Sequence, residues 1–237
     1  MSAEGFPPAL RLGGREVPLR VERHPRARRM CLRICPASGT IRLTLPRQAS
    51  SSAAEAFLAT HHDWMLRSIE RSMAAPRPFV VGADIPFAGE VLRIVEGHGR
   101  AIARDGELLR VPGPDWRVNA RVALWLRREA QALLEAETRA LAATLGRPVA
   151  RVAVSDPRSR WGSCSTSGTI SFSWRLILAP PFVRRAVVAH EVAHLAEPHH
   201  GPAFWRLAQA LLGAPHTPAR QWLRAHGPAL HRWGQTG

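Results

Sequence analysis

The sequence VVAHEVAHLAEPHHGPAFW, residues 187–205, decides the fold of the second half of this chain. His190 and His194 are four positions apart, and Glu191 directly follows the first of them. On a helix, positions four apart differ by only about 40° in direction, so these two imidazoles share a face and can hold one ion. The pattern His-Glu-x-x-His is typical of a helix that binds zinc and places a glutamate beside the metal.

A third histidine follows a predicted break in this helix. If the helix continued, His200 would point about 240° away from His194. Pro198 disfavours helical geometry in the residue before it and cannot donate an interior backbone hydrogen bond. We therefore expect a helix over about 181–197 that ends near Glu197, after which the chain turns back toward the metal face.

Three histidines with an open fourth position are typical of a catalytic zinc site rather than a closed structural one. We predict that His190, His194 and His200 bind Zn²⁺, with His199 as the competing choice for the third ligand. Zinc lowers the pKa of its bound water, and Glu191 is placed to take a proton from that water. The pattern thus predicts a zinc-dependent hydrolase with Glu191 as its catalytic residue.

The rest of the sequence predicts an α+β fold. Alternating apolar and polar residues indicate short strands at 9–46 and 79–111, around one helix at about 50–72. A long amphipathic helix over about 115–145 precedes a strand at 149–154, and further helices are expected at 202–212 and 218–230. We predict two domains, namely a β-rich region with one helix at 1–112 and a compact helical domain with a short antiparallel sheet at 113–237. No internal repeat is evident in the sequence.

The composition is strongly basic, with a formal net charge of +15 and a sequence pI of about 11.7. This charge favours an anionic partner such as a nucleotide or nucleic acid. All 33 basic residues are arginines, however, which suits a coding bias equally well. Three cysteines are too few for a disulfide framework, and neither a secretory signal nor a membrane-spanning segment is evident. These features predict a cytoplasmic protein without a membrane partner.

Several segments in the second half carry a resemblance to a known family. They are, in order, R-W-G-S-C-S at 160–165, a glycine at 168, H-E-V-A-H-L at 190–195, and a histidine at 200 followed by F-W at 204–205. This order and spacing resembles that of YgjP-like metallopeptidase domain proteins, relatives of the SprT-type and wider gluzincin-like peptidases. The resemblance is looser over the first half, and it implies a zincin-like C-terminal domain that cleaves peptides or proteins.

Three residues near the motif are predicted to contact substrate, namely Arg160, Ser163 and His199. A guanidinium offers paired donors to a carboxylate or phosphate, although a structural ion pair is an equally good explanation of Arg160. The chain contains no tyrosine. Stabilisation of a negatively charged oxygen during hydrolysis must therefore come from a histidine, an arginine or backbone amides.

Two other functions compete with peptide hydrolysis. The first is a nucleoside triphosphate pyrophosphatase that uses the same zinc site, which the family resemblance also raises and the positive charge favours. The second is a nucleic-acid-associated protein of SprT-like character. The sequence contains no aromatic-basic stacking motif or recognition helix that would support this second alternative.

Overall fold

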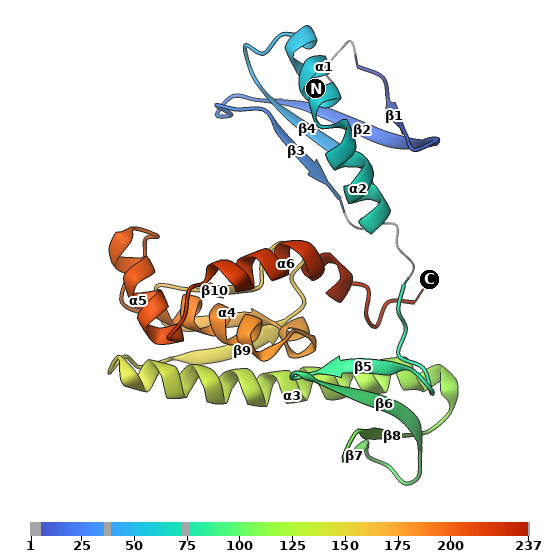
Figure 1. Ribbon diagram of the computed structural model, residues 1–237, viewed down its shortest axis with the longest axis vertical. Coiled ribbons are helices and arrows are strands. Elements are labelled where there is room, and N and C mark those ends of the chain that lie inside the picture. Colours follow the sequence, from blue (N-terminus) through green and yellow to red (C-terminus); the bar gives the residue numbers. More distant parts are fainter. Residues whose placement is uncertain (1–5, 36–38, 73–75, 237) are drawn as a thin grey trace. The chain divides into compact units, whose positions relative to one another are not determined.

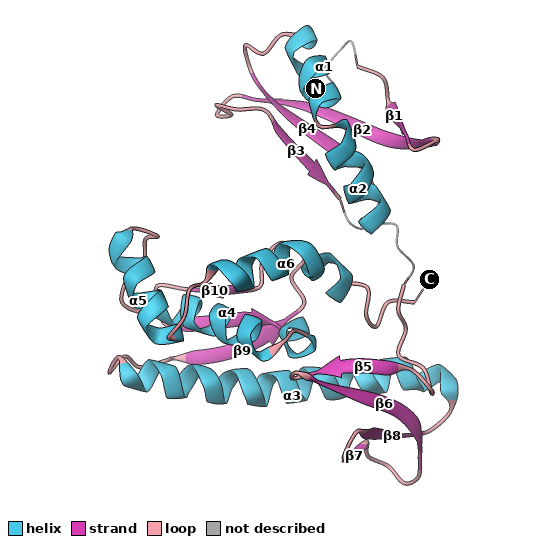
Figure 2. Cartoon of the chain, in the orientation of Figure 1, coloured by secondary structure: helices cyan, strands magenta, loops and turns pink. Residues whose placement is uncertain are grey.

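The computed structural model describes residues 6–35, 39–72 and 76–236, and the chain divides into two compact units, Met1–Ala75 and Pro76–Gly237. The α+β class is confirmed, since helices and small sheets occur in both units (Figures 1 and 2). The expected boundary between residues 112 and 113 lies inside the second unit, and this division into domains stays a prediction.

The first unit is a four-stranded sheet with two helices. Its strands, in the spatial order β1-β2-β4-β3, are β1 (Ala9–Leu12), β2 (Arg15–His24), β4 (Ile41–Pro46) and β3 (Cys31–Ile34). Apolar residues of β2 and β4 form a core with helices α1 (Ser51–Thr60) and α2 (His62–Ser72). The prediction of one helix was wrong, because His61 leaves helical geometry and its ring Nδ1 donates to the carbonyl oxygen of Phe57 at 2.8 Å.

The second unit begins with a sheet of the same topology. Its strands, in the order β5-β6-β8-β7, are β5 (Asp84–Phe87), β6 (Glu90–Gly97), β8 (Leu108–Pro112) and β7 (Ala103–Asp105). In each sheet the strands that come second and fourth along the chain, β2 with β4 and β6 with β8, pair in parallel. The other neighbouring strands pair antiparallel. The two sheets therefore repeat one strand arrangement, which the sequence did not reveal.

A long helix organises the remainder of the second unit. Helix α3 (Asp115–Thr144) buries residues at intervals of four, which gives it one continuous apolar stripe. It packs against β9 (Arg151–Ser155) and α4 (Pro181–Ala193), and α6 (Thr217–Leu230) packs on α4 in turn (Figure 1). A short 3₁₀ segment, η1 (Trp174–Leu178), leads into α4, and α5 (Pro202–Leu212) follows it.

The small sheet of this unit is mixed rather than purely antiparallel. Strand β10 (Gly162–Cys164) pairs antiparallel with β11 (Thr169–Ser173), as predicted. Strand β9 instead pairs in parallel with β11, so the order is β10-β11-β9 and the antiparallel prediction was incomplete. Strand β11 is therefore central, and β10 is the edge strand that lies against α4.

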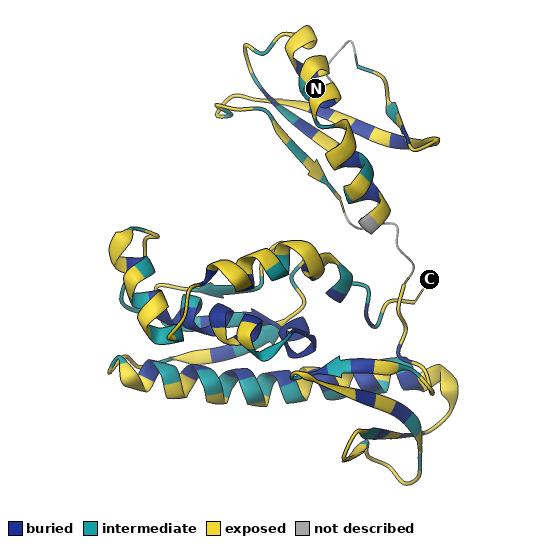
Figure 3. Ribbon diagram, viewed as in Figure 1, coloured by how far each residue is buried: buried dark blue, intermediate teal, exposed yellow. Residues whose placement is uncertain are grey.

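Helix α4 is anchored deep in the unit. Most of its residues are buried (Figure 3), and the buried guanidinium of Arg184 donates to both carboxylate oxygens of Glu137 on α3, at 2.9 and 3.1 Å. This bidentate ion pair fixes the helix that carries the first two histidines of the motif. Within the described ranges, no helix has the length and apolar composition that a membrane crossing requires.

Candidate metal centre

Two histidines lie at the C-terminal end of α4. His190 belongs to its last turn and His194 is its C-cap residue, so the helix ends about four residues earlier than predicted. The backbone amides of Leu195 and Ala196 bond three residues back, which tightens the end of the helix. The imidazole Nδ1–H of His194 donates to the carbonyl oxygen of Glu197 at 3.1 Å. This bond orients the ring and leaves its Nε2 free for a ligand.

The turn after α4 brings a third histidine to the same place. One ring nitrogen of each of His190, His194 and His200 lies within 4.8 Å of the others, and the Nε2 atoms of His190 and His200 are 3.0 Å apart. Zinc–nitrogen bonds of about 2.0–2.1 Å place ligand pairs about 3.3 Å apart in a tetrahedral site. The three imidazoles therefore fit a shared metal ion, whereas His199 is exposed and does not belong to this group among the described residues.

One buried aromatic ring contacts all three imidazoles. The ring centroid of Phe204, in the first turn of α5, lies 4.8 Å from that of His190, 4.5 Å from that of His194 and 4.6 Å from that of His200. Phe204 is fully buried, so its position is set by core packing. The histidines are thus positioned before any metal binds, which reduces the entropy lost on binding.

Burial also controls the protonation of the site. Burial, with the neighbouring histidines and Arg220, lowers the pKa of His190 to about 4. Burial likewise lowers the pKa of His194. Both imidazoles are therefore neutral at pH 7, as metal ligation requires.

Glu191 is almost completely buried, with 5% of its surface exposed. Burial raises the pKa of its carboxyl group to about 7, and the positive charge of Arg160 opposes this shift. Gly162 of β10 approaches it closely, since a Cβ on this glycine would lie 2.6 Å from the Glu191 Cγ. A glycine at 162 is therefore what leaves room for the carboxylate.

The buried carboxyl predicts a pH-dependent stability of the metal-free protein. The pKa of Glu191 is about 7 in the folded chain against an ordinary value of 4.5, so folding binds a proton between these pH values. The contribution of Glu191 to stability is therefore lost as pH rises from about 4.5 to 7. We expect the metal-free variant Glu191→Gln to melt at a higher temperature than the wild type at pH 8, with a much smaller difference at pH 5. Thermal melts in the presence of a chelator test this, and equal differences at both pH values would contradict it.

Two of the three predicted substrate contacts, Ser163 and Arg160, lie on or next to β10, whereas His199 is exposed in the turn between α4 and α5. Ser163 is half-buried in this edge strand opposite Ser171, and Arg160 is exposed just before it. Cys164 is also half-buried, and burial together with the charge of Glu191 raises the pKa of its thiol. A raised pKa disfavours the thiolate, which agrees with a structural role for this cysteine.

A cavity of about 400 Å³ is lined by His190, Glu191 and His200 of the site. Its wall includes His216, the N-cap residue of α6, which is 8% exposed and whose Nε2 finds no hydrogen-bond partner in the described part of the chain. Its ring lies 6.3 Å from that of His190. Sequence analysis missed His216, because it is 22 residues beyond the His-Glu-x-x-His pattern and no local spacing connects the two.

Of the comparisons with known proteins, the family model supports the family resemblance. A search of curated proteins found no match. Among solved structures, the chain is similar to the metallopeptidase zymogen abylysin of Pyrococcus abyssi, with a TM-score of 0.35 and 21% identity over 40% of this chain and 92% of that one. The family model named YgjP-like, metallopeptidase domain matches residues 28–226, which include every residue of the metal centre. This chain belongs to the YgjP-like metallopeptidase domain family.

Proposed function

We propose that this protein is a zinc-dependent peptidase in which Glu191 is the catalytic base. One observation supports this proposal above all others. The ring nitrogens of His190, His194 and His200 converge within 4.8 Å, and the buried Glu191 shares the wall of one cavity with His190 and His200. Membership of a metallopeptidase family supports the peptide bond as the target.

The donor set suits zinc. Three neutral imidazoles with no fourth protein ligand among the described residues leave a position for water or substrate. A zinc ion held there would supply a Lewis acid and lower the pKa of a bound water. The chain itself supplies the orientation, through the bond from His194 to Glu197 and the packing of Phe204.

Glu191 moves the proton in this proposal. Its carboxylate accepts a proton from the water that attacks the peptide carbonyl carbon. It then donates that proton to the amine nitrogen that leaves when the C–N bond breaks. Burial raises the pKa of Glu191, which makes its carboxylate a stronger base than that of an exposed glutamate.

The edge strand β10 is placed to align the substrate. It pairs with β11 on one side, and the other side bears no strand in the described part of the sheet. An extended peptide can add to such an edge through backbone hydrogen bonds. Strand β11 is central in this sheet, so the role falls to β10, which contains Ser163 and directly follows Arg160 and Trp161.

His216 is the best candidate to stabilise the oxygen that becomes negatively charged. It lines the cavity beside His190 and Glu191, and its buried Nε2 lacks a partner among the described residues. A substrate carbonyl oxygen would supply that partner. Because the chain contains no tyrosine, stabilisation of this oxygen has to come from another residue, and His216 is a histidine in a suitable position.

We expect His216→Ala to lower kcat by about 10²–10³-fold, the usual cost of removing one such donor, with little change in KM or in bound zinc. The matched control is His226→Ala, an exposed histidine on the same helix, which should leave kcat unchanged. Steady-state kinetics and metal analysis test this. An unchanged kcat, or loss of zinc from the His216 variant, would show that the residue has another role.

The proposed function is tested by adding zinc to chelator-treated protein and measuring cleavage of a mixed library of fluorogenic peptides. We expect cleavage that requires zinc and reaches its maximum at one zinc per chain. Nucleoside triphosphates are tested in parallel. Absence of peptide cleavage by folded, zinc-loaded protein would contradict a peptidase, and zinc-dependent release of pyrophosphate would favour the alternative.

A further inference from the structure

We infer that the cavity beside the metal centre is a specificity pocket for a large apolar side chain of the substrate, next to the bond that is cleaved. This inference rests on the proposed peptidase function and adds the class of substrate. The volume and the lining of the cavity support it.

Residues from one face of each of two helices, α4 and α6, line the cavity. On α4, Ala186 and Val187 lie one turn before His190 and Glu191, so the apolar pair and the catalytic pair share one face. On α6, His216, Ala219 and Leu223 follow at intervals of three and four residues, which also places them on one face. A side chain in the cavity therefore lies directly beside the reacting groups.

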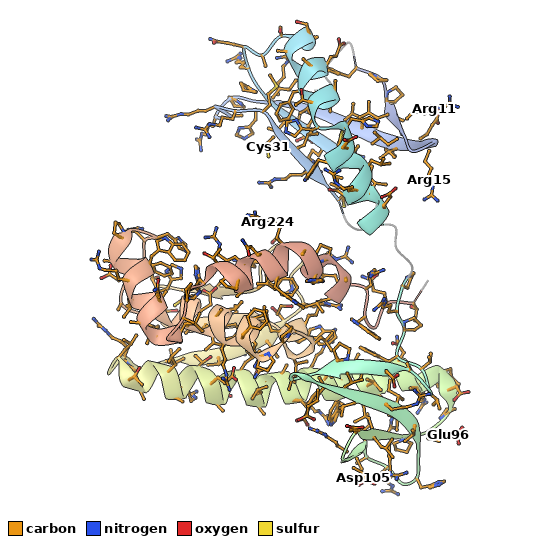
Figure 4. All side chains as sticks on the ribbon, viewed as in Figure 1. Arg11, Arg15, Cys31, Glu96, Asp105 and Arg224 are labelled. Carbon is orange, nitrogen blue, oxygen red and sulfur yellow. The ribbon has the colours of Figure 1, made fainter. Side chains whose placement is uncertain are left out.

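Two tryptophans complete the lining. The ring of Trp161 packs against Gly227 of α6, where a Cβ would lie 2.8 Å from the Trp161 Cζ2. Trp205 of α5 lies with its ring centroid 5.7 Å from that of His190. Aromatic walls of this kind favour flat or bulky apolar groups. The neighbouring Arg224 is exposed and extends from α6 away from α4, so it does not contribute to the lining (Figure 4).

The volume points to a large occupant. A cavity of about 400 Å³ falls in the range of roughly 300–1,000 Å³ that is typical of ligand sites. A glycine or alanine side chain would leave the apolar part of the lining, formed by Ala186, Val187, Ala219, Leu223 and the two tryptophans, in contact with water. Burial of a phenylalanine or leucine side chain instead stabilises the complex by removing its apolar surface from water.

The one arginine in the lining does not convert the cavity into an anion site. The guanidinium of Arg220 lies 5.5 Å from the ring centroid of Trp205, in a cation–π contact, and the residue as a whole is exposed. Glu191 is a buried carboxylate in the same wall, and it would repel an acidic side chain. Preference of the protein for an acidic side chain at this position would therefore contradict the inference.

The test varies one substrate position at a time in a peptide library cleaved by zinc-loaded protein. We expect one position flanking the cleaved bond to favour Phe, Leu or Trp over Ala by at least about tenfold in kcat/KM. Binding of the same peptides to the zinc-loaded Glu191→Gln protein, followed by tryptophan fluorescence, should show the same preference without cleavage.

Two variants then change the volume of the cavity in opposite directions. Ala219→Leu should fill it and reduce the preference for the large side chain, whereas Leu223→Ala should enlarge it and shift the preference from Phe toward Trp. The matched control is Ala225→Leu, an exposed alanine on α6, which should leave the preference unchanged. Thermal melts establish whether each variant is folded. If Ala219→Leu does not fold, Leu223→Ala still tests the inference.

The possible outcomes separate the two proposals. Cleavage without preference for a large apolar side chain, or with preference for an acidic one, would overturn the specificity pocket and leave the peptidase intact. If neither Ala219→Leu nor Leu223→Ala alters the preference for a large apolar side chain, that side chain binds elsewhere and the inference about this cavity is wrong. Failure of folded, zinc-loaded protein to cleave any peptide would overturn both.

Discussion

The substitution Glu191→Gln is expected to lower kcat by about 10³-fold or more while the protein keeps its zinc. Glutamine has nearly the same shape as glutamate but cannot accept the proton of the attacking water, and general base catalysis contributes about 10²–10⁴-fold to such reactions. Glu191 is buried and lies next to His190 in the sequence, and it does not belong to the group of three histidines proposed to bind zinc. Metal analysis and turnover of a cleaved peptide measure the two effects separately.

This experiment requires a check that the Glu191→Gln variant is folded. The raised pKa of Glu191 predicts that the neutral glutamine will not destabilise the metal-free protein, so loss of activity cannot be attributed to unfolding. Retained turnover in a folded variant with one zinc per chain would remove Glu191 from the role of base.

The substitution His200→Ala is expected to weaken zinc binding by more than about 100-fold, because removing a direct ligand should exceed the 10–100-fold cost of losing an outer-shell partner. His199→Ala is the matched control, since both residues are exposed neighbours in the same turn and only His200 belongs to the converging group. Competition with a zinc-binding dye at pH 7 measures both affinities.

A larger loss of zinc affinity in His199→Ala than in His200→Ala would make His199, rather than His200, the third zinc ligand. In that case the turn after α4 would have to rotate on metal binding, since the His200 Nε2 lies 3.0 Å from that of His190 in the structure. Equal and small effects of both variants would mean that zinc binds elsewhere. Either result would revise the ligand set but not the family.

Local spacing explains why the centre was predictable from sequence. His190 and His194 are related by the geometry of a single helix turn, and this geometry is independent of the rest of the fold. The turn at Pro198 was also predictable, because proline restricts its own backbone and that of its neighbour. The position of the helix end was less predictable, since it depends on hydrogen bonds at the cap, including the one from the His194 ring to Glu197.

Contacts between distant segments explain what sequence analysis missed. His216 reaches the cavity only because α6 packs on α4, and Gly162 reaches Glu191 only because β10 lies against α4. The parallel pairing of β9 with β11 is of the same kind, since the strands are separated by the whole of β10. The repeated strand order of the two four-stranded sheets is likewise a property of backbone pairing and left no clear trace in the side chains.

The sequence by itself determined the α+β class, the family and the residues proposed to bind zinc, because each depends on residue types at short, fixed spacing. Only the tertiary structure decided which strand forms the edge beside Glu191, which histidine completes the cavity and how large that cavity is. These features depend on the packing of α6 and β10 against α4, where side chains far apart in sequence come into contact, and short-range patterns contain no information about such contacts.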